Sequence, residues 1–374
     1  MDSITRQRPR PAVHSFSLRY LLVVPILLAI LTGYVLFAHG DTNTYMLYSQ
    51  CHARSRLPWL AQIPLLGSPA CFLVSFFQEA VASTRAFSIM AVILSFVAGL
   101  LTISTVEAAR ICNSPNALIA YPTGPWLVFN LIGGAVVWQL VIIPAFFHRS
   151  RQIIAARKNG VPQQLSGPAD PTFGEAMRQL ARAAEAVAIP VAVVAGYVLP
   201  SVLMLVLKHP ATVLVWLFFP IWVSVIRQVT RKGVLLVRDA WSSSLHLESN
   251  RIATAVIYTA PILLSVAAHA HFIWALTQPD DRKELTRSTL KFITIDAFFI
   301  GLTVLYWVLI EAGWRVALVI LASSLVFGPG AGVCLGWIYR EQTVDLDRGV
   351  TVVAVGSRRA SEDADPTEES PLLR

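Results

Sequence analysis

Long apolar runs separated by short polar segments dominate the chain. Several runs reach the roughly 20 residues that an α-helix needs to cross about 30 Å of hydrocarbon. The pattern predicts an all-α, polytopic transmembrane helical bundle over residues 20–340. Its eight predicted spans are 20–38, 86–106, 125–147, 186–207, 210–226, 252–276, 292–311 and 314–338. Proline interrupts some of them, which membrane helices tolerate where neighbouring groups satisfy the freed backbone.

A ninth apolar segment, residues 63–82, is ambiguous between a broken span and a re-entrant segment. It holds four polar or helix-breaking residues, namely Pro64, Pro69, Gln78 and Glu79. If the N-terminus is cytoplasmic and this segment crosses, the basic N-terminal tail and the basic loops 149–185 and 227–251 all lie inside. The positive-inside rule therefore favours a ninth crossing.

Two tails flank the bundle. Residues 1–19 are basic, and residues 341–374 are acidic, so we expect the second tail to be disordered. The chain ends in EESPLLR, which fits an acidic dileucine sorting signal. Such a signal works in the cytoplasm, whereas nine crossings place this tail in the lumen. These two predictions conflict.

Composition supports the membrane class. The chain is 55% hydrophobic and only 14% charged, with a mean hydropathy of +0.60, whereas soluble proteins carry about 25% charged residues. The net charge of +8 does not indicate nucleic-acid binding, because the basic residues fall in short loops between spans. The expected partner is the lipid bilayer. The four cysteines lack metal-site spacing, and we predict no metal and no cofactor.

Asp296 is the first candidate for chemistry, because an ionisable group inside a span is costly and is a functional candidate by default. It is either a general acid or a carboxylate with a structural hydrogen bond near the membrane surface. Glu311 lies 15 residues further along the same helix, about 22 Å away. It therefore cannot act with Asp296 directly and is expected to mark the opposite membrane surface. A second acid must come from another helix.

Other polar residues also admit two interpretations. Glu79 is buried only if segment 63–82 folds back into the bundle. Glu107 and Arg110 are spaced to pair on one helix face, either as an interfacial salt bridge or as a pair at the mouth of a cavity. His269 shares a helical stripe with Tyr258, as a polar lining or an interhelical hydrogen bond. Trp307 shares the stripe of Asp296.

Known catalytic motifs are absent. The sequence has no Walker A loop, HExxH, GxSxG or paired aspartate-rich motif, and the acidic cluster in QPDDRKE (278–284) is expected to be a solvated loop. His269 and His271 lie about 200° apart around a helix, so they do not form a metal site.

Four stretches together resemble fungal integral-membrane cyclases of meroterpenoid pathways, of the larger type found in ascofuranone-like and macrophorin-like routes. They are LPWLAQIPLLGSPACFLVSFFQEAVASTR, VEAAR, HAHFIWAL and FGPGAGVCLGWIYREQ. The resemblance implies an enzyme that binds a prenylated, typically farnesylated, aromatic or quinol. Such an enzyme protonates a terminal epoxide or olefin and cyclises the carbocation without a metal or an organic cofactor. It also implies functional coupling with a membrane prenyltransferase and an epoxidase, and we expect residence in the endoplasmic reticulum.

The sequence therefore predicts a membrane terpene cyclase. Asp296 is the expected acid, with Glu79 or Glu107 as its partner. The expected substrate-binding residues are Arg110, Tyr258, His269 and Trp307. A transporter or channel is the main alternative, and it requires polar, discontinuous helices near the midplane on more than one span. A membrane prenyltransferase and a purely structural membrane protein are further alternatives.

Overall fold

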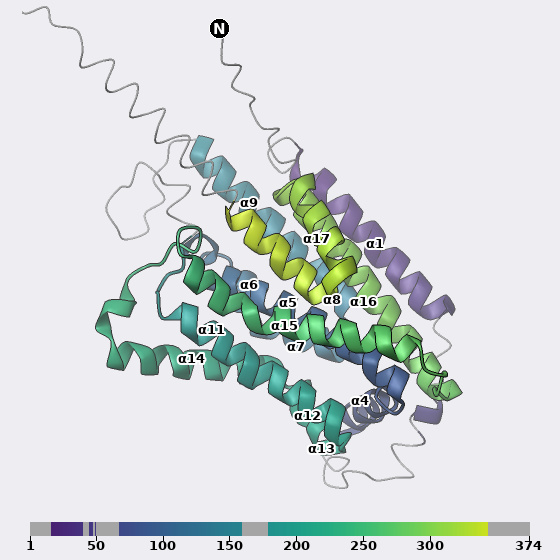
Figure 1. Ribbon diagram of the computed structural model, residues 1–374. Helices are drawn as coiled ribbons and strands as arrows, with labels where there is room; N and C mark the ends of the chain where they lie inside the picture. Colours follow the sequence, from purple (N-terminus) through teal and green to yellow (C-terminus); the bar gives the residue numbers. More distant parts are fainter. Residues whose placement is uncertain (1–15, 40–44, 48, 50–66, 159–178, 343–374) are drawn as a thin grey trace, which may run out of the picture.

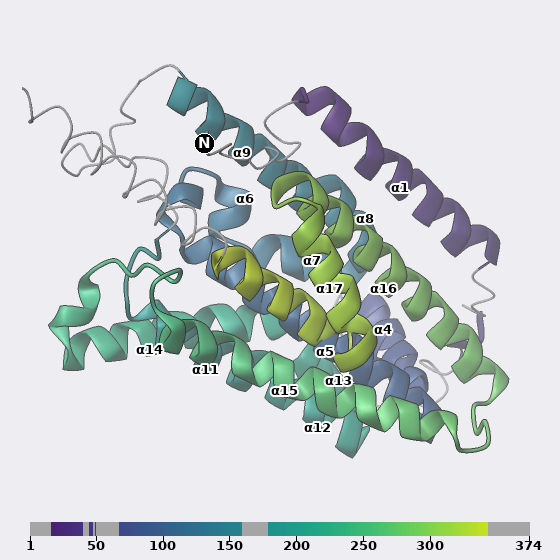
Figure 2. The same cartoon turned by 45° about the horizontal axis from the view of Figure 1, so that its top comes forward.

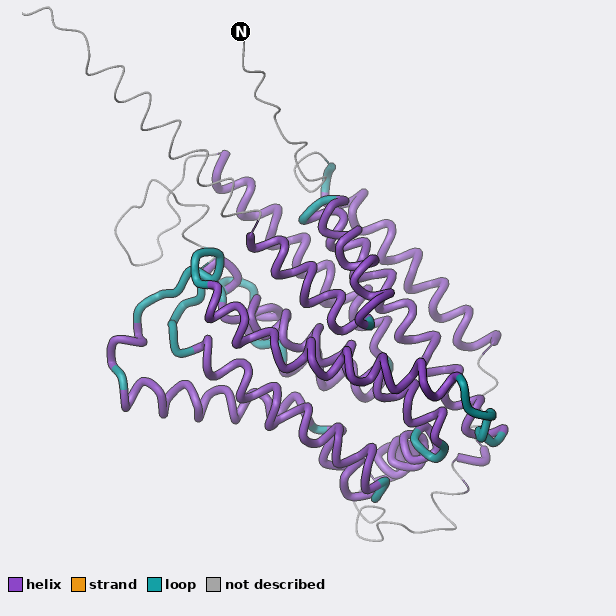
Figure 3. The backbone as a smooth tube through the Cα atoms, viewed as in Figure 1, coloured by secondary structure: helices purple, strands orange, loops and turns teal. Residues whose placement is uncertain are grey.

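The computed structural model describes residues 16–39, 45–47, 49, 67–158 and 179–342, and within these residues it contains helices but no strands (Figure 3). The predicted all-α class is confirmed. Most of both predicted tails lies outside the described residues.

Five helical segments are long and apolar enough to cross a membrane, fewer than the eight predicted. They are α1 (Leu18–His39), α5 (Thr84–Ala109), α11 to α12 (Glu185–Leu207), α15 (Arg251–Leu276) and α16 (Glu284–Glu311). A sixth is the pair α13 (Pro210–Leu217) and α14 (Phe219–Val237), which is bent by 62°. The outer face of α1 exposes large apolar side chains at the edge of the bundle, as a lipid-facing helix does (Figure 2).

Backbone contacts define two ends of the bundle. At the Arg110 end, formed by residues 110–122, 179–184 and 238–250, the N–H of Ile111 donates to Gln179 and that of Leu180 to Leu245. At the Asp281 end, formed by residues 81–84, 208–209 and 277–283, the N–H groups of Thr84 and Arg85 donate to the Asp281 carboxylate at 2.6 and 3.1 Å. Five predicted crossings between Arg85 and Asp281 would put them on opposite sides, so the predicted order of crossings is wrong.

The ambiguous segment 63–82 contains α4 (Gly67–Ala80), which is not among the candidate spans. Its 14 residues extend for about 21 Å, short of the hydrocarbon thickness. Gln78, near its end, donates to the carbonyl of Lys208 at 3.1 Å, and Lys208 directly follows α12 at the Asp281 end. α4 thus packs at that end, and the ninth crossing that the positive-inside rule favoured is not among the candidate spans of the described residues.

The predicted span 125–147 is a helical hairpin. α7 (Thr123–Ile132) stops at Gly133, whose φ of 112° is readily adopted only by glycine. The chain then returns through α8 (Gly134–Val137), the π-helical turn η3 (Trp138–Ile142) and α9 (Ile143–Lys158). The rings of Trp126 and Trp138 lie 6.1 Å apart, whereas twelve residues of straight helix would separate them by about 18 Å. Trp126 bonds Ser104 near the end of α5 and Arg149 bonds the Cys112 carbonyl, so both arms lead to the Arg110 end.

The predicted span 314–338 is a second helical hairpin. α17 (Trp314–Phe327) ends at Gly328, with φ of 89°, and residues 329–342 form a helix that folds back against it. Gly330 packs on the backbone of Ser95, and Arg340 pairs with Glu107 further along α5. Because α5 runs toward the Arg110 end, the returning helix ends there too.

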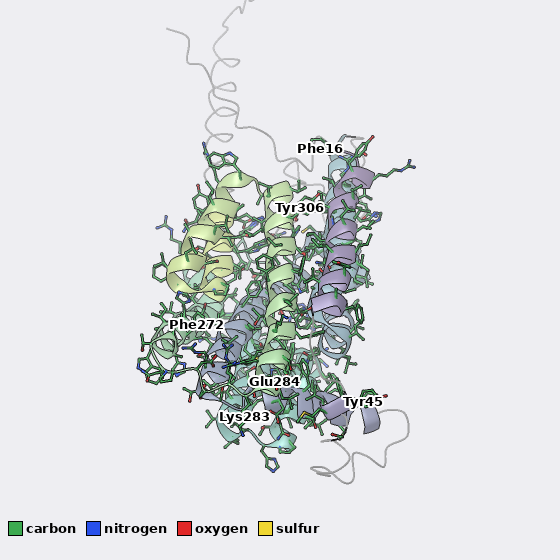
Figure 4. The ribbon with its side chains drawn as sticks, turned by 90° about the vertical axis from the view of Figure 1, so that its right-hand side faces the viewer. Phe16, Tyr45, Phe272, Lys283, Glu284 and Tyr306 are labelled. Carbon is green, nitrogen blue, oxygen red and sulfur yellow. The ribbon has the colours of Figure 1, made fainter. Side chains whose placement is uncertain are left out.

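If the bent pair α13 and α14 is counted as one crossing, six crossings and two hairpins bring the first and last described residues to one end of the bundle. The Tyr306 hydroxyl donates to the carbonyl of Leu21 in α1, and Arg340 lies 3.9 Å from Glu311, one turn beyond Tyr306 on α16. Lys283 and Glu284 mark the opposite end of that helix (Figure 4). The described parts of both termini therefore lie at the Arg110 end.

Candidate functional site

A cluster of charged side chains is buried at the Arg110 end, where α5, α15, α16 and the helix 329–342 converge (Figure 1). The guanidinium of Arg110 donates to Glu107 at 2.9 Å and to Glu341 at 2.6 Å, and all three side chains are at most 6% exposed. Burial alone disfavours the charged guanidinium, but the two carboxylates outweigh it and raise the pKa of Arg110 well above its ordinary value. Arg110 is therefore a fixed positive charge.

Glu107 is the most heavily bonded member of the cluster. Besides Arg110, it accepts hydrogen bonds from Asn113 at 3.0 Å, Trp337 at 3.3 Å and Arg340 at 3.2 Å. Both of its oxygens accept hydrogen bonds from these donors. Such bonds offset the desolvation of a buried ion pair, so Glu107 holds the surrounding side chains in place.

Two tryptophans cover the side of the cluster toward α16. Arg340 lies over the ring of Trp337, 4.5 Å from its centroid, and this ring packs at a tilt of 39° against Trp307, with 4.8 Å between the ring centroids. The indole N–H of Trp307 donates to Glu311, and that carboxylate lies 3.9 Å from Arg340. The faces of these rings present negative quadrupoles, which attract cations.

Two buried polar atoms in the cluster have no hydrogen-bond partner among the described residues. They are the hydroxyl of Tyr258 and the second oxygen, Oε2, of Glu341. Tyr258 is 0% and Glu341 3% exposed, and the phenol interacts electrostatically with Glu341, Arg110 and Cys334. Buried polar atoms are nearly always paired, and both of these can bond a polar group of a bound molecule.

An apolar cavity of about 750 Å³ lies between α5, α15, α16 and the second hairpin. Its apolar lining includes Ile89, Phe96, Phe272, Phe298, Leu302, Val304, Ile320 and Val333. Trp307 follows Val304 by three residues on α16, and Trp337 follows Val333 by four, so both tryptophans lie about one turn beyond the inner end of the cavity. The cavity thus leads from the apolar bundle toward the charged cluster.

Asp296 lies outside this cluster. Its carboxylate accepts hydrogen bonds from the N–H groups of Gly134 at 3.0 Å and Ala135 at 2.9 Å, at the start of the helix that returns from the first hairpin. A carboxylate suits this position, because the first N–H groups of a helix lack partners and carry partial positive charge. The neighbouring residues Ile295 and Ala297 line the cavity, whereas Asp296 does not. This geometry corresponds to the structural hydrogen bond that the sequence allowed, and the catalytic role of Asp296 stays a prediction.

The structure brings together four of the seven predicted site residues, namely Glu107, Arg110, Tyr258 and, through Glu311, Trp307. Glu79 lies at the Asp281 end, separated from Glu107 by most of the length of α5, about 35 Å. It cannot assist Glu107 directly. His269 is half-buried next to Gly328, eleven residues and about 16 Å along α15 from Tyr258.

Sequence reasoning missed Arg340, Glu341 and the pairing of Glu311. The motif WIYREQ contained a signal, since it places Trp337, Arg340 and Glu341 within five residues at the end of an apolar run. It did not reveal that these residues meet α5. Among the described residues, no three His, Cys, Asp or Glu side chains are grouped to hold a metal ion.

Comparison with known proteins adds no assignment. No family model matches the sequence, and no curated protein or solved structure is significantly similar to it.

Proposed function

We propose that this protein is a membrane cyclase that protonates the terminal epoxide or olefin of a prenylated aromatic or quinol and closes rings through a carbocation. One observation carries the proposal. The Tyr258 hydroxyl and Glu341 Oε2 are buried and unpartnered within the described structure, and the helix that carries Glu341 contributes Val333, eight residues earlier, to the lining of an apolar cavity. Protonating such a group requires an acid sheltered from water beside an apolar substrate.

We propose a role in this reaction for each side chain of the cluster. Glu341 is a carboxylate partner of Arg110 through Oε1, so the proposed reaction requires Oε2 to take up a proton before that proton is transferred to the substrate. When that proton leaves, the new carboxylate remains beside the Arg110 guanidinium, which stabilises it. Tyr258 can orient the accepting oxygen of an epoxide through its hydroxyl. Trp307 lies about one turn beyond Val304 at the inner end of the cavity and is the aromatic side chain proposed to stabilise the carbocation, because the ring of Trp337 already contacts Arg340 and Trp307.

The proposed reaction is a balanced isomerisation. Proton transfer to an epoxide oxygen breaks one C–O bond and leaves a hydroxyl group and a carbocation. Each neighbouring olefin then attacks the cationic carbon, which forms a C–C bond and moves the charge along the chain. Loss of a proton from a carbon next to the final cation restores an olefin, and the released proton returns to the Glu341 carboxylate.

The experiment supplies microsomes of a heterologous host with a farnesyl-phenol epoxide and, separately, with the corresponding olefin. We expect cyclic products from the wild type and a rate about 10²–10⁴-fold lower from Glu341→Gln. Gln preserves the size of the side chain and its bond from Arg110. The exposed Asp239→Asn at the same end is the control. Wild-type failure on both substrates, and on the same two compounds with a carboxylate on the ring, rejects the function. Full activity of Glu341→Gln at equal protein level rejects Glu341 as the acid.

A transporter is the second candidate, and a specific feature favours it. Both hairpins place a broken helix inside the bundle, at Gly133 and at Gly328, and broken helices often form transport sites. In such sites the N-terminus of a half-helix binds an anionic substrate. Here the N-terminus after Gly133 already binds the carboxylate of Asp296. Substrate-dependent uptake into proteoliposomes, without any change of the substrate, would support the transporter.

A further inference from the structure

The outer part of the apolar cavity is basic. Four cationic side chains line it near the Asp281 end, namely Arg85, Arg282, Arg287 and Lys291. Phe272 and Lys283, on neighbouring elements, lie toward this end of the molecule (Figure 4). Together with residues 277–291, Arg85 gives this region five basic residues against three acidic ones. An apolar cavity with a positively charged mouth fits an amphiphile with an anionic headgroup.

Two of the three acidic residues in this region, Asp280 and Asp281, have partners, and Asp281 accepts from the N–H groups of Thr84 and Arg85. Asp280 accepts two hydrogen bonds from Arg282, at 2.8 and 2.9 Å, and lies 3.2 Å from Arg287. The bond from Arg282, helped by both guanidinium charges, lowers the pKa of Asp280 below its ordinary value. The single negative charge of Asp280 is therefore shared between two guanidinium groups, Arg282 and Arg287, so a net positive charge remains at the mouth.

Arg85 is held in place by the end of α15. Its Nη2 donates to the carbonyls of Ala275, Leu276 and Gln278 at 3.3, 3.2 and 2.6 Å. Its buried Nε has no partner among the described residues. Carbonyl oxygens carry no net charge, so the guanidinium keeps its full positive charge beside the cavity.

We infer that the cavity binds a single-chain amphiphile with one carboxylate, which lies among these four cations while the chain extends inward. Lys291 and Val304 both line the cavity and stand thirteen residues apart on α16, about 20 Å. A farnesyl chain on an aromatic ring spans such a length. The volume of about 750 Å³ suits a drug-sized molecule better than a two-chain phospholipid.

The inference rests on the proposed function and narrows its substrate class to an aromatic carboxylic acid with a prenyl chain. With the carboxylate at the mouth, the terminal double bond or epoxide of the chain lies toward Val304 and Val333. Those residues precede Trp307 and Trp337 by about one turn, so the reactive end of the chain points toward Tyr258 and Glu341.

The test measures binding of 3-farnesyl-4-hydroxybenzoate and of its methyl ester to the purified full chain in nanodiscs of uncharged lipid. We expect the acid to bind roughly tenfold more tightly than the ester. Added salt should weaken the binding of the acid and leave the binding of the ester unchanged. Arg287→Gln should remove most of this preference. Lys283→Gln makes the same change of charge at an exposed neighbour that does not line the cavity, and it should leave the preference intact.

Three outcomes overturn the inference: equal affinity for acid and ester, equal effects of the two variants, or displacement of the acid by phosphatidic acid in the nanodisc. The last would assign the basic mouth to a membrane lipid. Binding and turnover separate the two proposals. Preference for the acid without ring formation rejects the cyclase alone, and ring formation without that preference rejects the headgroup site alone.

Discussion

Asp296 Oδ1 accepts a hydrogen bond from the backbone N–H of Ala135 at 2.9 Å, across 161 residues of sequence. This bond, with its neighbour from Gly134, gives a physical reason for an acid inside an apolar helix. The chain reverses at Gly133, and the helix that follows begins within the bundle, where water does not satisfy its first N–H groups. The carboxylate supplies the missing acceptors.

Asp296→Ala should therefore lower stability. Two buried N–H groups lose their acceptor, and each such loss costs about 1–3 kcal/mol. Thermal unfolding of the detergent-solubilised protein measures this, with Leu309→Ala, at an exposed site on the same helix, as the control. If Asp296→Ala unfolds at the wild-type temperature and yet makes no cyclic product, Asp296 is catalytic rather than structural.

Tyr258→Phe should lower cyclase turnover without lowering stability, because the hydroxyl it removes has no hydrogen-bond partner among the described residues. Tyr197→Phe is the matched control. Its equally buried hydroxyl donates to the carbonyl of Leu94 at 2.9 Å, so its loss should cost about 1–3 kcal/mol. Unfolding temperature and turnover are measured for both variants. Unchanged turnover in Tyr258→Phe would remove this hydroxyl from the mechanism.

Gly133→Ala and Gly328→Ala should each destabilise the protein by about 1–2 kcal/mol, because a side chain disfavours positive φ. Gly328→Ala should lose more stability than Gly133→Ala, because its new Cβ would lie 2.8 Å from Ser265 Oγ. Gly233→Ala, inside α14 with no atom within 4 Å of the added Cβ, should instead stabilise by about 0.5–1 kcal/mol. Denaturation of the three purified variants provides the comparison, and equal stability of all three would argue against the two hairpin turns.

The hairpins also predict which loops share a side of the membrane. Tyr121 and Ser243 lie at the Arg110 end and Lys283 at the Asp281 end, whereas the eight predicted spans put three crossings between Tyr121 and Ser243. The helix ends that lead to the Arg110 end add further basic residues, namely Arg149, Arg227, Arg231, Lys232 and Arg251, so we expect this end to face the cytoplasm. N-glycosylation acceptor tags inserted after each residue report this directly. Only the tag after Lys283 should be glycosylated, and different outcomes at Tyr121 and Ser243 would contradict the first hairpin.

The sequence by itself determined the all-helical class and five helices that are long and apolar enough to cross a membrane. A helix that meets lipid must be apolar over about 20 consecutive residues, and that is a local property of the sequence. It also revealed the pair of Glu107 and Arg110, because a spacing of three residues places both on one helix face. It singled out Asp296 as a costly carboxylate and favoured a general acid, whereas the hydrogen bonds from Gly134 and Ala135 correspond to its structural alternative.

Only the tertiary structure decided where the chain reverses and which charges meet. Residues 125–147 and 314–338 are as apolar as true spans, and a glycine within an apolar run is equally compatible with a straight helix. The turn at Gly133 depends on a carboxylate 163 residues later, and the buried pairing of Arg110 depends on Glu341, 231 residues away. Hydropathy and periodicity describe how each helix meets its surroundings. They carry no information on which distant group will satisfy a freed N–H or neutralise a buried charge.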